Sequence, residues 1–152
     1  MTKSFDELIA KLDGCPLKIV SVAVAQDAPV LEAIKVAKER NIADAILVGD
    51  EDKIKEIAAS IQMDLSGYEI IDEKDITEAA RKAVSLVHEG KADMYMKGMI
   101  DTKGFLKSVL DKEVGLRTGQ PLSHVCVFDV EGIDQLLFLS DVAFILYPTL
   151  ED

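Results

Sequence analysis

The chain has 152 residues, 49% of them hydrophobic and 30% charged, which indicates a soluble globular protein rather than a disordered segment. Its formal net charge of −11 argues against a nucleic-acid or anionic-membrane partner, because phosphate groups attract patches of Lys and Arg. No basic, hydrophobic leader opens the chain and no apolar run approaches about 18 residues, so we expect a cytoplasmic protein without a membrane span.

Up to about residue 97 the chain repeats one unit: an apolar run that predicts a strand, a turn, and an amphipathic helix. A short helix over residues 4–12 precedes the repeat, with Ser4 as its N-cap and Glu7 in capping-box spacing. Strands are predicted at residues 17–25, 44–49, 68–71 and 94–96. The helices between them are predicted to begin near Asp27, near Asp50 or Asp52, and at Asp75. This alternation implies βαβ units and an α/β three-layer sandwich with a mainly parallel sheet.

The pattern changes after Lys97. Asp101 and Thr102 can cap a helix that runs to about Leu110, and a loop with glycines at 115 and 119 follows it. Apolar runs at 124–130 and 135–139 lie too close for a parallel crossover, so they predict an antiparallel hairpin before Pro148. Since no linker interrupts the chain, we expect residues 1–152 to form a single α/β domain.

Cations, hydroxyls and glycines gather between residues 93 and 130, at the ends of apolar runs. Ligands of parallel α/β sheets bind beyond the carboxyl ends of the strands, where Lys97 and Gly98 fall. Lys97 and Arg117 can neutralise a phosphate, and Gly98 would let a ligand approach the backbone. The helix that begins near Thr102 offers N–H groups to an anion.

Three further polar residues flank the predicted hairpin. Ser123 can donate a hydrogen bond to a phosphate or a carbonyl oxygen, and His124 can hold or move a proton near neutral pH. Asp141 is either a site carboxylate or a turn former.

Each of these residues also has a purely structural interpretation. Lys97 can be a solvated turn residue, Arg117 an exposed loop residue, and Ser123 and His124 can satisfy backbone groups. His88, near a helix end, is expected to complement the helix dipole. No metal site is predicted, because the two histidines and two cysteines are dispersed, and neither a GxGxxG nor a P-loop pattern occurs.

Four strings carry a family resemblance that runs from about Lys18 to Asp152: VAQDAPVLEAIKVAKERNIADAILVGD, MKGMIDTKGFLKSVLDKEVGLRTG, PLSHVCVFDVEGIDQLLFLSDVAF and YPTLED. Taken together and in this order, they resemble the phosphate butyryltransferases of the phosphate acetyl/butyryl transferase family. The resemblance implies a reaction of acyl-CoA with phosphate that gives acyl phosphate and CoA, within butanoate metabolism.

The resemblance also implies a fold like that of isopropylmalate dehydrogenase, with two α/β lobes, a site in the cleft between them, and a homo-oligomer. CoA would be a substrate, and no tightly bound cofactor is expected. This chain would supply one side of the cleft. Ser123 and His124 would be catalytic, and substrate would be bound by Lys97, Gly98, Thr102, Arg117 and Asp141.

Two departures from the family pattern accompany the resemblance. Family members continue well beyond Pro148 into a second lobe, and Ile145 stands where the family has an Asn. We therefore expect the chain to correspond to the first lobe. Two rival hypotheses are a non-catalytic CoA- or phosphate-binding lobe and an inactive remnant of the enzyme; a dehydrogenase of the related fold is disfavoured, since the chain has no acidic metal cluster.

Overall fold

The computed structural model describes residues 2–120, 122–141, 145, 147 and 149. The chain forms two compact units, and we describe each by itself. The larger unit is Pro16–Arg117, and the smaller one combines Met1–Cys15 with Thr118–Asp152. The expectation of a single α/β domain over residues 1–152 stays a prediction.

The larger unit is built on a parallel sheet of four strands in the order β3-β2-β1-β4. The strands are β1 (Lys18–Ala23), β2 (Ala43–Gly49), β3 (Glu69–Asp72) and β4 (Met94–Lys97). In the register of the sheet, Ala23 of β1 lies between Val48 of β2 and Lys97 of β4. The strands therefore end at one common edge, which we call the carboxyl edge.

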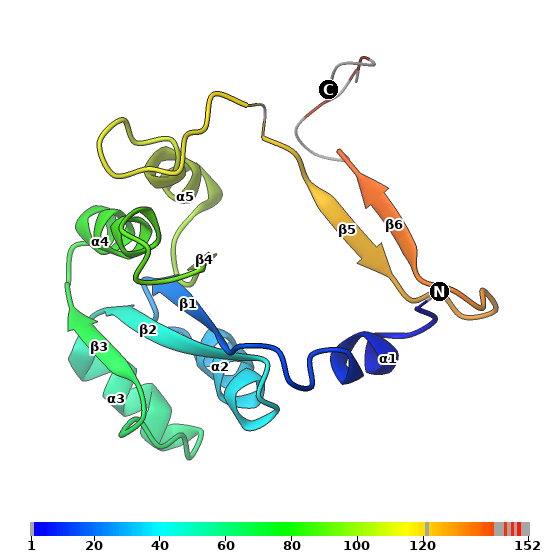
Figure 1. Ribbon diagram of the computed structural model, residues 1–152. Helices are drawn as coiled ribbons and strands as arrows, with labels where there is room; N and C mark the ends of the chain where they lie inside the picture. Colours follow the sequence, from blue (N-terminus) through cyan, green and yellow to red (C-terminus); the bar gives the residue numbers. More distant parts are fainter. Residues whose placement is uncertain (1, 121, 142–144, 146, 148, 150–152) are drawn as a thin grey trace. The chain divides into compact units, whose positions relative to one another are not determined.

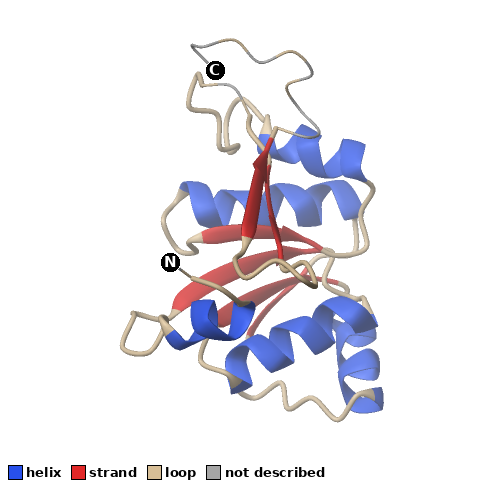
Figure 2. Cartoon of the chain, turned by 90° about the vertical axis from the view of Figure 1, so that its right-hand side faces the viewer, coloured by secondary structure: helices blue, strands red, loops and turns tan. Residues whose placement is uncertain are grey.

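Helices cover both faces of this sheet. They are α2 (Ala28–Glu39), α3 (Glu51–Ser60), α4 (Ile76–His88) and α5 (Thr102–Val109). Figure 1 shows α2 and α3 on one face and α4 with α5 on the other, and Figure 2 shows the same layering from the side. The predicted α/β fold with a mainly parallel sheet is confirmed.

The alternation of side chains along β2 explains why both faces are covered. Leu47 points to one face and packs in a cluster with Leu31 and Ile54 of the helices there. Its neighbours on the strand, Ile46 and Val48, belong to the cluster of the other face, with the alanines of α4. Successive residues of a strand point to opposite faces, so an apolar run such as residues 43–49 is stable only between two layers of helices.

Acidic residues cap most of these helices, as their sequence positions predict. Asp50, Asp75 and Asp101 accept hydrogen bonds from backbone N–H groups in the first turns of α3, α4 and α5. Asp27 also occupies the N-cap position of α2, but its side chain makes no capping hydrogen bond. Asp27 is therefore the N-cap of α2 by its position, without a hydrogen bond from its side chain to the helix.

The smaller unit contains helix α1 (Phe5–Ala10) and an antiparallel hairpin of β5 (Val125–Phe128) and β6 (Leu137–Ser140). The predicted hairpin is confirmed. Ser4 caps α1 by accepting from the N–H of Glu7, whereas the Glu7 carboxylate accepts from the N–H of Lys3 rather than of Ser4. Pro148 lies outside the described residues. Among the described residues, no helix is long and apolar enough to cross a membrane.

Candidate functional site

The connections of the sheet diverge at the carboxyl edge between β1 and β4. The chain leaves β1 toward α2 on one face and leaves β4 toward α5 on the other face (Figure 1). Such a divergence of connections is where open α/β sheets bind ligands. Lys97 ends β4, whereas Gln26, which follows β1, is buried and accepts a hydrogen bond from the N–H of Asp50.

Lys97 and Thr102 come together at this edge. The Nζ of Lys97 lies 3.4 Å from Oγ1 of Thr102, and both residues are exposed. Lys97 is the last residue of β4 and Thr102 is the first of α5, so a turn of only four residues joins them. An ammonium group next to a hydroxyl offers charge-assisted donors to an oxyanion.

Gly98 packs against the end of β1, a contact that the sequence did not predict. It is buried, and its N–H donates to the carbonyl of Ala23 at 2.7 Å. A Cβ at this position would lie 2.3 Å from the carbonyl oxygen of Val24. Glycine is thus required because the turn after β4 packs directly on the end of β1, whether or not a ligand also approaches its backbone.

The carboxylate of Asp101 caps the N-terminus of α5. Asp101 accepts from the N–H of Gly104 at 2.7 Å, so it occupies one of the donors that the sequence assigned to a bound anion. The N–H of Gly104 is therefore not among the groups that an anion at this helix end would use.

Val24 contributes strain that sequence reasoning missed. Its φ of 55° lies in the left-handed region, which β-branched residues rarely adopt, and its side chain is buried. Its carbonyl accepts from the N–H of Met99 at 2.9 Å, which ties the end of β1 to the turn after β4. An uninterrupted apolar run predicts extended backbone throughout, so no sequence signal marked this residue.

Arg117 is exposed at the end of the larger unit, directly after a tight turn at Gly115. A Cβ on Gly115 would lie 2.4 Å from the carbonyl oxygen of Asp111, so this turn also requires glycine. Arg117 and Lys97 are both exposed to solvent. The backbone is closely packed at Gly98, next to Lys97, and at Gly115, two residues before Arg117.

Ser123, His124 and Asp141 belong to the smaller unit. The N–H of Asp141 donates to the carbonyl of His124 at 2.6 Å, and the N–H of His124 donates to Oδ1 of Asp141 at 3.2 Å. Asp141 has a φ of 60°. It therefore lies at the open end of the hairpin, where it joins the residue before β5 to the residue after β6. Both of its predicted roles, site carboxylate and turn former, stay predictions. Ser123 is exposed, and His124 is half-buried with its ring nitrogens 3.6 and 3.7 Å from the Cys126 sulfur.

The structure thus places the predicted substrate-binding residues Lys97, Gly98, Thr102 and Arg117 on the larger unit. The predicted catalytic pair, Ser123 and His124, lies on the smaller unit with Asp141. Within each unit the structure brings together one pair, Lys97 with Thr102 and His124 with Asp141. All seven assignments to a site stay predictions.

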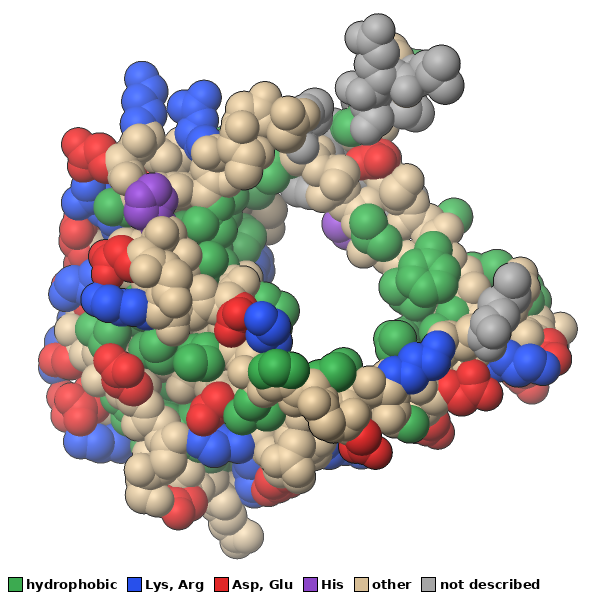
Figure 3. Space-filling model, in the orientation of Figure 1, with side chains coloured by type: hydrophobic (Ala, Val, Ile, Leu, Met, Phe, Trp, Pro, Cys, Tyr) green, Lys and Arg blue, Asp and Glu red, His purple; other side chains and the backbone are tan. Residues whose placement is uncertain are grey.

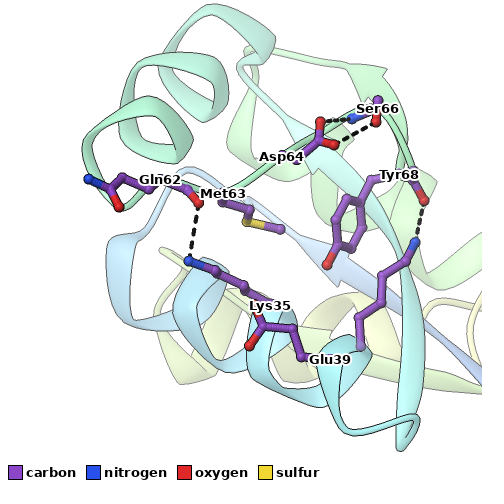
Figure 4. A pocket seen from close by; sticks show the side chains of 9 residues that line it. Lys35, Glu39, Gln62, Met63, Asp64, Ser66 and Tyr68 are labelled. Carbon is purple, nitrogen blue, oxygen red and sulfur yellow. Dashed lines mark hydrogen bonds between the residues drawn. The ribbon is translucent and has the colours of Figure 1, made fainter.

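A separate pocket of about 340 Å³ lies at the opposite, amino edge of the sheet, between α2 and the segment that leads into β3 (Figure 4). The two lysines that line it, Lys35 and Lys38, make contacts within the fold. Lys35 donates to the carbonyls of Ile61 and Gln62, which end α3. Lys38 pairs with Asp44 and lies over the ring of Tyr68. Burial, followed by the charge of Asp44, raises the pKa of Tyr68 above its ordinary value.

The described residues contain no group of three or more His, Cys, Asp or Glu that could hold a metal ion.

Comparison with known proteins gives the family. The family model described as "Phosphate acetyl/butaryl transferase" matches residues 5–81 and 73–152. The chain belongs to this family. It is 62% identical over 152 residues to a phosphate butyryltransferase of Clostridium beijerinckii and 58% identical to one of Clostridium acetobutylicum. Each alignment covers 100% of this chain and 50% of the relative, so the chain spans about half the length of the curated relatives it matches.

Solved structures agree with the fold. A branched-chain phosphotransacylase from Enterococcus faecalis superposes with a TM-score of 0.68 at 26% identity, over 88% of this chain and 46% of that one. The EutD phosphotransacetylase from Staphylococcus aureus, at 22% identity, superposes with a TM-score of 0.65 over 86% of this chain and 47% of its own. The resemblance to the phosphate acetyl/butyryl transferase family that the sequence motifs carried is confirmed.

Proposed function

We propose that this chain supplies one side of a phosphate acyltransferase site that interconverts butyryl-CoA and phosphate with butyryl phosphate and CoA. The observation that supports it best is Lys97 beside Thr102 at the carboxyl edge, in a chain 62% identical to a phosphate butyryltransferase. Since the chain spans half the length of that relative, the proposed site also uses groups from the half that the chain does not match.

The proposed chemistry is acyl transfer between sulfur and oxygen. Toward butyryl-CoA, the CoA sulfur attacks the carbonyl carbon of butyryl phosphate, a C–S bond forms, and the C–O bond to phosphate breaks. His124 takes the thiol proton, and Ser123 donates a hydrogen bond to the carbonyl oxygen as negative charge develops there. Lys97 and Arg117 neutralise the departing phosphate. Gly98, Thr102 and Asp141 complete the substrate-binding set.

We also propose the properties that accompany this reaction in the family resemblance. Acyl-CoA, CoA and phosphate are the ligands, CoA acts as a substrate, and no tightly bound cofactor takes part. The protein is cytoplasmic and functions as a homo-oligomer. Its net charge of −11 makes the local cations at the carboxyl edge the natural place for an anionic ligand.

A chimera tests the proposal. The half of the Clostridium beijerinckii relative that aligns with this chain is replaced by this chain, and CoA release from butyryl-CoA is measured with and without phosphate. We expect phosphate-dependent CoA release within about tenfold of the rate of the parent enzyme. A folded chimera that releases no CoA, beside an active parent, would refute the proposed function.

The exposed Lys97–Thr102 pair also fits a second candidate, a lobe that binds CoA or phosphate without catalysis. Calorimetry on the 152-residue chain separates the candidates. Phosphate binding that is lost in Lys97→Ala, together with an inactive chimera, favours the binding lobe. Absence of both binding and activity indicates an inactive remnant.

A further inference from the structure

The loop after α5, which we call the 111–116 loop, is held in one conformation by its own contacts. Oδ1 of Asp111 accepts from the N–H groups of Glu113 and Val114, at 2.8 and 3.1 Å. The N–H of Leu116 donates to the carbonyl of Val109 at 2.8 Å. These two bonds on Asp111 lower the pKa of its carboxyl group below the ordinary value. The loop ends immediately before Arg117.

Helix α4 binds this loop at two points. Arg81 forms an ion pair with Glu113 and lies 3.9 Å from Oδ2 of Asp111. Nδ1 of His88 lies 2.9 Å from the carbonyl oxygen of Gly115. Arg81 and His88 are seven residues apart, which is about two helical turns, so both project from the same side of α4.

The hydrogen bond from His88 to Gly115 shows which ring nitrogen of His88 carries a hydrogen. A carbonyl oxygen can only accept, so Nδ1 of His88 carries the proton and donates it.

We propose that His88, assisted by Arg81, is a positioning residue for Arg117. This inference rests on the proposed function, in which Arg117 binds phosphate. A guanidinium binds an oxyanion through paired donors in a fixed plane, so its affinity depends on where the backbone places it. His88 holds Gly115, which lies two residues before Arg117, and the ion pair of Arg81 holds the same loop at Glu113.

The test is a titration of the 152-residue chain with inorganic phosphate, followed by NMR of the Lys97 and Arg117 amides. His88→Leu removes the donor and is expected to weaken the Kd for phosphate about fivefold, the ratio for one ordinary hydrogen bond. Its Leu116 amide is expected to exchange with solvent faster. His88→Asn places an amide donor close to the position of Nδ1 and is expected to restore both values.

Lys82→Met is the matched control, because Lys82 is also on α4 but pairs with Glu73. It is expected to change neither value. Unchanged phosphate affinity in His88→Leu overturns the positioning role, and so does weakened affinity that His88→Asn fails to restore. Arg117→Met separates the two proposals: if it leaves phosphate binding unaltered, then Arg117 is not a phosphate ligand and that part of the proposed function fails.

Discussion

The Nζ of Lys97 lies 3.4 Å from Oγ1 of Thr102, across the turn that joins β4 to α5. The pair lies beside the end of β1, since Lys97 is in register with Ala23. A cation and a hydroxyl thus meet at the edge where the connections of the sheet diverge. We therefore expect this pair to contribute to the affinity for phosphate.

Lys97→Met in the chimera is expected to raise the KM for phosphate by about 10- to 100-fold, because a hydrogen bond to a charged group contributes about 1.5–3 kcal/mol. The KM for butyryl-CoA should change far less. Lys103→Met is the control, since Lys103 is an exposed lysine on the same helix as Thr102. Equal effects of both substitutions would indicate general loss of positive charge rather than a specific contact.

Gly98→Ala is expected to destabilise the larger unit by about 1–3 kcal/mol, as overpacking does in a closed site. The cause is the added Cβ, which would lie 2.3 Å from the carbonyl oxygen of Val24. Urea unfolding followed by circular dichroism measures the change. A variant with wild-type stability but weaker phosphate binding would instead assign Gly98 to the ligand alone.

Asp141 should tolerate substitution in the order Asn, then Gly, then Val. Asn keeps an acceptor for the N–H of His124 and tolerates the φ of 60°, whereas Gly keeps only the backbone conformation. Val loses the acceptor and adds about 1–2 kcal/mol of strain in the left-handed region. Thermal unfolding of the three variants gives the order, and a Val variant as stable as Asn would contradict this account of the hairpin.

Asp93 links the starts of β1 and β4, and its contribution to stability is expected to depend on pH. Its carboxylate accepts from Nζ of Lys18 at 2.7 Å and from the N–H of Ile19 at 2.9 Å. The Lys18 bond, then the Ile19 bond, lowers the pKa of Asp93. A lowered pKa means that the contribution is fully present above the unfolded value, about pH 4, and is lost as the pH falls through the folded value.

Asp93→Asn should therefore shift the urea midpoint at pH 7 and have a progressively smaller effect as the solution is acidified. Asp6→Asn serves as the control, because Asp6 is an exposed carboxylate of the other unit. An effect of Asp93→Asn that stays constant down to about pH 2, below the ordinary range of carboxylates, would show that charge is not its cause.

The hairpin exposes large apolar side chains and is expected to drive self-association. Val125 and Phe138 are 61% and 63% exposed, and hydrophobic side chains are visible over β5 and β6 in Figure 3. A two-stranded hairpin with open edges also offers unpaired backbone groups. Phe138→Thr should reduce the mass measured by light scattering, and Met99→Thr, at an exposed apolar residue of the larger unit, should not. A wild-type chain that stays monomeric would contradict this.

The sequence predicted what local chemistry determines. Strands at 44–49 and 94–96, and caps at Asp75 and Asp101, were recognisable because a strand or cap depends on a few neighbouring residues. The hairpin was also predicted, since its connection is too short for any other pairing.

The remaining features depend on contacts between distant residues. The ion pair of Arg81 with Glu113 spans 32 positions, and that of Lys18 with Asp93 spans 75. Nothing in the apolar runs specified that β1 lies between β2 and β4. The left-handed Val24 was hidden for a different reason, because the rest of the fold imposes a conformation that its own side chain disfavours. The contact of His88 with the carbonyl of Gly115 spans 27 positions, so the sequence alone showed only a histidine that complements a helix dipole.

Phosphorus NMR of the reaction products tests the central claim most directly. The chimera is incubated with butyryl-CoA and inorganic phosphate, and butyryl phosphate is quantified beside the CoA that is released. The account predicts that the two products appear in equal amounts and that both decrease in Lys97→Met. CoA released with butyrate and without butyryl phosphate, or no product from a folded chimera, would contradict it.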